Sequence, residues 1–157
     1  MRPVMDKLET YLNDHLTGSI VALDLARRRA STQGDDRFGT FLRTFVRDVE
    51  QDQKVLRRVM ESVGATPRVT RELLGTAASW LDSIRGAFSM PGAPNLVRDL
   101  ELLIMGVRGK QLIWTSLERL GHTTDPPLPE LKARARDQIA GLEGLHALAV
   151  GEELGAT

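Results

Sequence analysis

The chain has 157 residues, its 21 basic and 21 acidic side chains cancel at neutral pH, and it contains no cysteine. The balanced charge argues against a protein that wraps nucleic acid, because such proteins carry a basic excess. The lack of cysteine excludes disulfides, thiol catalysis and cysteine-ligated zinc or iron–sulfur centres.

The N-terminal residues and the apolar runs predict where the protein resides. The first ten residues, M-R-P-V-M-D-K-L-E-T, lack the apolar core of a signal peptide. No apolar run reaches the ~18 residues that a membrane span needs. We therefore expect a cytoplasmic protein without membrane association, and the length predicts a single domain over residues 1–157.

Apolar residues recur at intervals of three and four along the chain, which is the period of amphipathic helices. The first helix is predicted over residues 3–30. The second follows over residues 36–63, with an aspartate at its N-cap and Gly64 directly after its last turn. At ~1.5 Å per residue, each of these helices would be roughly 40 Å long.

Three further helices are predicted in the second half of the chain. Thr66 is a capping residue followed by a first-turn proline, and these two residues open a shorter helix over residues 68–88. A break rich in proline and glycine separates it from the third long helix, over residues 95–120. The fourth long helix is predicted over residues 129–154.

The lengths of the connections predict how these helices pack. The first two long helices are joined by a short connection, as are the last two, so each pair is expected to form an antiparallel hairpin. About thirty residues, including the shorter helix, link the two hairpins. This order predicts an all-α four-helix bundle with a helical crossover. The alternative is an up-down-up-down bundle with an extra capping helix.

Polar stretches interrupt the apolar pattern near the middle of the long helices, as in Y-L-N-D-H (11–15), V-E-Q-D-Q (49–53) and L-E-G-L-H (142–146). Together with the order of the helices, they resemble the ferritin-like four-helix-bundle superfamily, in an uncharacterised bacterial branch. The resemblance implies a ferritin-like fold over nearly the whole chain. It also raises the question of a di-iron centre, which needs a Glu from two helices and Glu-x-x-His from the other two.

The di-iron motif is incomplete in this chain. Glu143 and His146 form one Glu-x-x-His, but Glu50 is followed three residues later by Gln53, and Lys110 lies in the middle of the third long helix. We therefore expect no cofactor, with an iron or manganese site as the alternative. The weak candidates for metal ligands are His15, Glu50, Asp52, Glu143 and His146.

The apolar stripe of each long helix becomes polar near its midpoint, at His15, Asp52, Lys110 and Gln138. Helix midpoints meet at one depth in an antiparallel bundle, so these residues predict a polar layer in the core. Burying such groups unpaired would cost several kcal/mol each. We expect an Asp52–Lys110 ion pair that is hydrogen-bonded to His15 and Gln138. In the alternative, Lys110 extends to solvent.

Glycines also interrupt the predicted helices, and each costs roughly 1 kcal/mol relative to alanine in a helix interior. Gly106 and Gly109, with Gly141 and Gly144, are expected to allow close approach of the last two long helices. Alternatively, these glycines and Gly18 leave room for a small ligand beside the polar layer.

Three functions follow from this pattern. The favoured one is a non-catalytic helical protein, expected to form a homodimer, whose polar layer is structural. The second is a metal- or small-ligand-binding protein that uses the bundle interior around His15, Glu50, Asp52, Gln138, Glu143 and His146. The third, a di-iron oxidase or ferritin, is disfavoured by the incomplete motif. No catalytic residue is identified.

Overall fold

The computed structural model describes residues 2–72, 74–76, 79, 83 and 95–155. Four long helices and no strand are found among these residues, so the predicted all-α class is confirmed. The helices differ from the predicted ranges by at most three residues at either end. They are α1 (Arg2–Gln33), α2 (Arg37–Ser62), α4 (Asn95–Arg119) and α5 (Leu128–Glu153).

The shorter helix that is predicted over residues 68–88 falls only partly within the described residues. Residues 71–72, 74–76, 79 and 83 are helical. The remainder of its apolar side, including Trp80 and Phe88, lies outside the described residues. Within the described ranges, none of the helices combines the length and the apolar content that crossing a bilayer requires.

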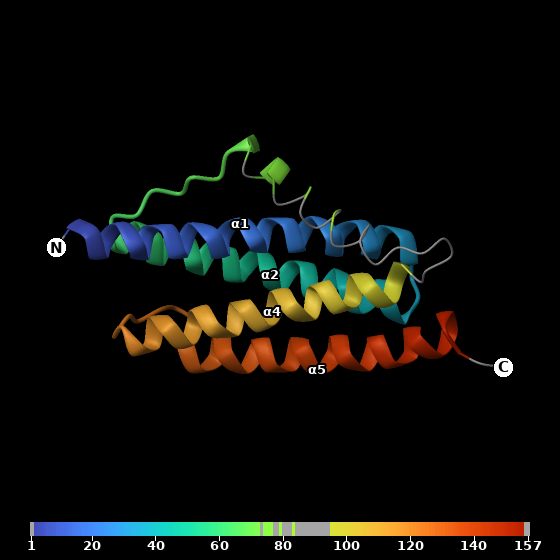
Figure 1. The fold of residues 1–157 in the computed structure, drawn as a ribbon. Coiled ribbons are helices and arrows are strands. Elements are labelled where there is room, and N and C mark those ends of the chain that lie inside the picture. The colour runs from blue at the N-terminus through green and yellow to red at the C-terminus, as the bar shows by residue number, and fades with distance from the viewer. Residues whose placement is uncertain (1, 73, 77–78, 80–82, 84–94, 156–157) are drawn as a thin grey trace.

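The four long helices lie side by side as two antiparallel pairs (Figure 1). The most extensive contacts are those within the pairs, α1 with α2 and α4 with α5, whereas α1 packs less extensively on α4, and α2 touches α5 only lightly. In Figure 1, α2 and α4 run in the same direction, whereas the up-down-up-down alternative requires them to be antiparallel.

Local sequence signals account for the ends of these helices. The Asp36 side chain caps α2 by accepting a hydrogen bond from the backbone N–H of Gly39 at 2.8 Å, which satisfies a donor that has no partner within the helix. Gly34 and Gly64 follow α1 and α2 with φ angles of +66° and +70°. Only glycine enters that region without steric cost, so both residues end a helix efficiently.

The buried side chains form two apolar clusters along the length of the helices. One cluster lies toward the C-terminal end of α1 and contains Phe45, Val107 and Leu142. The other lies toward the N-terminal end of α1 and contains Leu16 and Trp114. Along α2 and α4, Asp52 and Lys110 lie between the residues of these two clusters.

Candidate functional site

Asp52 and Lys110 form an ion pair in the core. The Nζ atom of Lys110 lies 2.6 Å from Oδ2 of Asp52. Their side chains are 4% and 12% exposed, respectively, so the pair is shielded from water and Lys110 does not extend to solvent. A buried pair of this kind is tolerated only when further hydrogen bonds satisfy the remaining donors and acceptors.

Gln138 of α5 supplies one of these further hydrogen bonds. Its Oε1 atom accepts from Nζ of Lys110, so the ammonium is held by one residue of α2 and one of α5. The Nε2 atom of Gln138 is buried and finds no acceptor among the described residues. The structure therefore brings together three of the four residues of the predicted layer.

Arg134 completes the cluster, and the sequence interpretation missed it. Its Nη1 atom lies 2.9 Å from Oδ1 of Asp52, so the one carboxylate is shared by two cations. Its Nη2 atom lies 3.7 Å from Oε1 of Glu130, at the exposed edge of the cluster. Arg134 precedes Gln138 by four residues and therefore lies on the same face of α5, a spacing that would have identified it. We call Asp52, Lys110, Arg134 and Gln138 the polar cluster.

Burial shifts the pKa of the Lys110 ammonium in the polar cluster. Removal from water lowers the pKa of Lys110, because the charged form loses its hydration, and the adjacent Asp52 carboxylate offsets only part of this effect. The Arg134 guanidinium adds to the lowering, whereas Asp48 opposes it. The carboxylate thus favours the charged form of a cation that burial disfavours.

His15 does not join the pair, so the predicted hydrogen bond from it to the Asp52–Lys110 pair is wrong. Its imidazole instead packs edge-on against Tyr11, with ring centroids 4.6 Å apart. Burial lowers the pKa of His15, and the nearby Asp14 carboxylate only partly opposes this effect. Burial thus favours the neutral form of His15, which lies beside the cluster and is not bonded to it.

The other candidate metal ligands are dispersed over the surface of the bundle. Glu50 pairs with Arg27 of α1. Glu143 lies 3.3 Å from Arg108, and His146 lies 3.1 Å from Glu101. Each candidate on α5 therefore faces its own partner on α4.

These positions do not fit a di-iron centre. Among the described residues, no group of three or more His, Asp or Glu side chains is placed to hold a metal ion. Asp52, the only acidic candidate in the core, has both oxygens engaged by cations. The ammonium of Lys110 would also repel a divalent metal at this depth.

The mid-helix glycines do not bring α4 and α5 together, so that prediction is wrong. A Cβ atom on Gly141 would lie 2.3 Å from the ring of Phe41, which belongs to α2. Gly106 and Gly109 face α1, because the nearest neighbours of an added Cβ are Ala22 at 3.6 Å and His15 at 3.9 Å. The spacing of the glycines indicated close approach between helices, but it did not identify which helix each glycine faces.

A cavity of about 380 Å³ lies between α1, α2 and α4. Gly18, Gly106 and Gly109 all contribute to its wall, together with side chains from the three helices. Gly18 and Gly106 are solvent-exposed, which places the opening of the cavity between α1 and α4. Three of the five glycines in the small-ligand alternative therefore line this cavity, whereas Gly141 and Gly144 do not.

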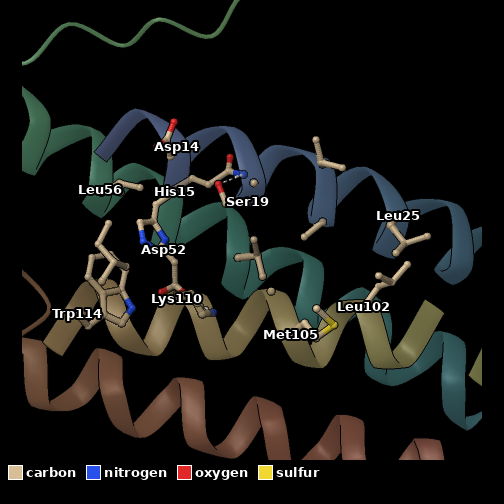
Figure 2. A pocket seen from close by; sticks show the side chains of 18 residues that line it. Asp14, His15, Ser19, Leu25, Asp52, Leu56, Leu102, Met105, Lys110 and Trp114 are labelled. Carbon is tan, nitrogen blue, oxygen red and sulfur yellow. Dashed lines mark hydrogen bonds and ion pairs between the residues drawn. The ribbon is translucent and has the colours of Figure 1, made fainter. Parts of the chain in front are cut away.

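The two ends of this cavity differ in chemistry (Figure 2). His15, Asp52, Lys110 and Trp114 gather at one end, and Ser19 follows toward the middle. The other end is apolar and is lined by Leu25, Leu102 and Met105. An elongated cavity with one polar end and one apolar end suits an amphipathic molecule.

No family model, curated protein or solved structure matches this chain.

Proposed function

We propose that this protein binds a small, largely apolar molecule in the cavity between α1, α2 and α4, and that its polar cluster is structural. The observation that carries the proposal is the cavity of about 380 Å³ beside the core. Its volume falls in the range of about 300–1,000 Å³ that small-molecule sites occupy. Most side chains along its length are apolar, and a few polar groups gather at one end.

The glycines in the wall of the cavity support this proposal. An alanine in place of Gly18 would meet no atom within 4 Å, and one in place of Gly109 would make only ordinary contact with His15. Alanine is sterically acceptable at both positions, and it is favoured over glycine by roughly 1 kcal/mol in a helix. Both residues therefore weaken α1 and α4 while keeping space open inside the bundle.

The arrangement of charges supports a structural role for the polar cluster. Both oxygens of Asp52 are engaged, by Lys110 and by Arg134. A carboxylate held in this way is unavailable as a general base, because its lone pairs already accept hydrogen bonds from two cations. We therefore favour binding over catalysis for the described residues that line the cavity.

The ferritin-like fold belongs to the same proposal. Its support is the order of the helices, with two antiparallel pairs and with α2 and α4 running in the same direction. If the fold is ferritin-like, the Lys110 ammonium lies at the same depth in the bundle as the metal ions of a ferritin-like di-iron protein. The proposal is therefore a ferritin-like bundle in which an ion pair replaces a metal centre.

We also propose that the protein forms a homodimer. Met105 and Leu112 are 60% and 63% exposed, and their spacing of seven residues places them on one face of α4. Exposed apolar side chains on one face are typical of surfaces that contact another protein. Sedimentation equilibrium of the wild type and of a Leu112→Glu variant tests this; a wild-type monomer at micromolar concentration would contradict it.

Binding of toluene tests the proposed function. Toluene is a small apolar probe, and calorimetric titration of the purified protein measures its affinity directly. We expect saturable binding to the wild type and its loss in Gly109→Leu, because the new side chain would extend from the wall into the cavity. Gly144→Leu is the matched control, since a Cβ at this position meets nothing within 4 Å and Gly144 does not line the cavity.

Two results would count against this function. The first is the absence of saturable toluene binding to the folded wild type; the second is equal binding by both leucine variants. A parallel titration with iron and manganese tests the metal alternative. Near-stoichiometric binding of either metal, without displacement of bound toluene, would favour a metal site.

A further inference from the structure

The shape of the cavity limits the ligand. The residues of α1 that line it extend from Asp14 to Leu25, a span of eleven residues or about 16 Å at 1.5 Å per residue. The volume of about 380 Å³ corresponds to roughly a dozen groups the size of a water molecule, at ~30 Å³ each. An elongated molecule of about ten non-hydrogen atoms would fill it.

The charges at the polar end are already matched. Asp52 pairs with Lys110 and with Arg134, and Arg134 is also close to Glu130. The other carboxylate that lines the cavity, Asp14, is solvent-exposed at its edge. A charged group on a ligand would therefore lose its hydration without gaining a buried counter-ion, which is costly.

Hydrogen-bonding capacity nevertheless remains at this end. His15 makes no hydrogen bond to any described residue, and a neutral imidazole offers one donor and one acceptor. The hydroxyl of Ser19 donates to the carbonyl of Leu16 at 2.7 Å and accepts from Gln53 at 3.1 Å. Its oxygen keeps one lone pair. The N–H of Trp114 is buried and likewise finds no acceptor among the described residues.

We infer that the ligand is an uncharged amphiphile. Its aliphatic or aromatic body lies along Leu25 and Leu102, and its hydroxyl or carbonyl oxygen accepts a hydrogen bond from His15. This inference rests on the proposed binding function and specifies the chemistry of that same cavity. Uncharged polar groups satisfy the open donors and acceptors without disturbing the pairing of Asp52.

A matched series of eight-carbon ligands tests this inference. We would titrate the wild-type protein at pH 7.5 with 1-octanol, octanoate and octylamine, which share one chain and differ in the charge of the polar end. Calorimetry is expected to give 1-octanol at least a tenfold higher affinity than either charged ligand. The binding should disappear in Gly109→Leu and persist in Gly144→Leu, as for toluene.

Variants of His15 test whether the polar group of the ligand contacts His15. His15→Phe removes the hydrogen bond, so we expect the affinity for 1-octanol to fall about tenfold relative to the affinity for toluene, as for one neutral hydrogen bond. His15→Gln keeps a donor and an acceptor and should retain most of the 1-octanol affinity. Circular dichroism establishes that both variants are folded.

The possible failures are distinguishable. If octanoate or octylamine binds most tightly while toluene still binds, the inference is wrong and the proposed function stands. If His15→Phe leaves the 1-octanol affinity unchanged relative to that for toluene, the polar end does not meet His15, and the inference is again wrong. If neither toluene nor any eight-carbon ligand binds to the folded wild type, both the proposed function and the inference fail.

Discussion

Asp52 neutralises two buried or half-buried cations, so its replacement by leucine is expected to destabilise the protein strongly. The Lys110 side chain is only 12% exposed and would keep Gln138 as its remaining partner within the polar cluster. An ammonium left in this environment without its carboxylate costs about 3–5 kcal/mol of unfolding free energy. Lys110→Met should cost less, about 1–3 kcal/mol, because Asp52 keeps the Arg134 guanidinium at 2.9 Å.

The double variant Asp52→Leu/Lys110→Met separates this explanation from simple loss of packing. It removes the carboxylate together with the more deeply buried cation, and Arg134, which is 26% exposed, keeps Glu130 nearby. We expect it to be at least about 1 kcal/mol more stable than Asp52→Leu alone, as coupled residues in contact require.

Urea unfolding followed by circular dichroism at pH 7.5 measures these differences, with Glu61→Leu as a control. Glu61 is an exposed carboxylate of the same helix, and its replacement should change the free energy of unfolding by no more than about 0.5 kcal/mol. The reasoning is refuted if Asp52→Leu costs no more than this control, or if the effects of the two single substitutions simply add.

Two further predictions concern the glycines and the pH dependence of stability. Gly141→Ala should destabilise the protein by about 1–3 kcal/mol, because its Cβ would lie 2.3 Å from an aromatic ring of α2. Gly144→Ala meets no atom within 4 Å and should stabilise by up to about 1 kcal/mol; equal effects in urea unfolding would contradict the packing. Burial lowers the pKa of His15 below its ordinary value of 6.5, so the unfolded chain binds a proton at higher pH than the folded protein. The free energy of unfolding should therefore fall as the pH is lowered from 7.5 through 6.5. His15→Phe should flatten this slope, and identical slopes in the two proteins would rule out the contribution of His15.

Helical periodicity was sufficient to predict contacts between residues that lie on different helices but at the same level along the bundle. Asp52 and Lys110 each lie on the apolar stripe of a long helix near its midpoint, and the structure places them 2.6 Å apart. Gln138 follows the same rule. Arg134 was missed because it lies at the border of its stripe, where its long side chain reaches inward from a half-exposed position.

The remaining errors arise where depth alone does not determine direction. His15 lies at a suitable depth, yet its ring packs on Tyr11 of its own helix. Gly106 and Gly141 suggested an α4–α5 contact, but the first faces α1 and the second faces α2. Spacing along a sequence identifies the residues on one face of a helix, whereas their neighbours depend on how the helix is rotated in the bundle.

The polar cluster also has a consequence for the alignment of the two helical hairpins. It connects α2 of the first hairpin to α4 and α5 of the second, although α2 and α5 otherwise touch only lightly. Sliding the second hairpin by one helical turn, about 5.4 Å, would carry Lys110 out of reach of Asp52 and place both against apolar neighbours. Apolar side chains tolerate such a shift far better than buried charges do. The polar cluster thereby favours one register between the two hairpins, in addition to apolar contacts such as that between Gly141 and Phe41.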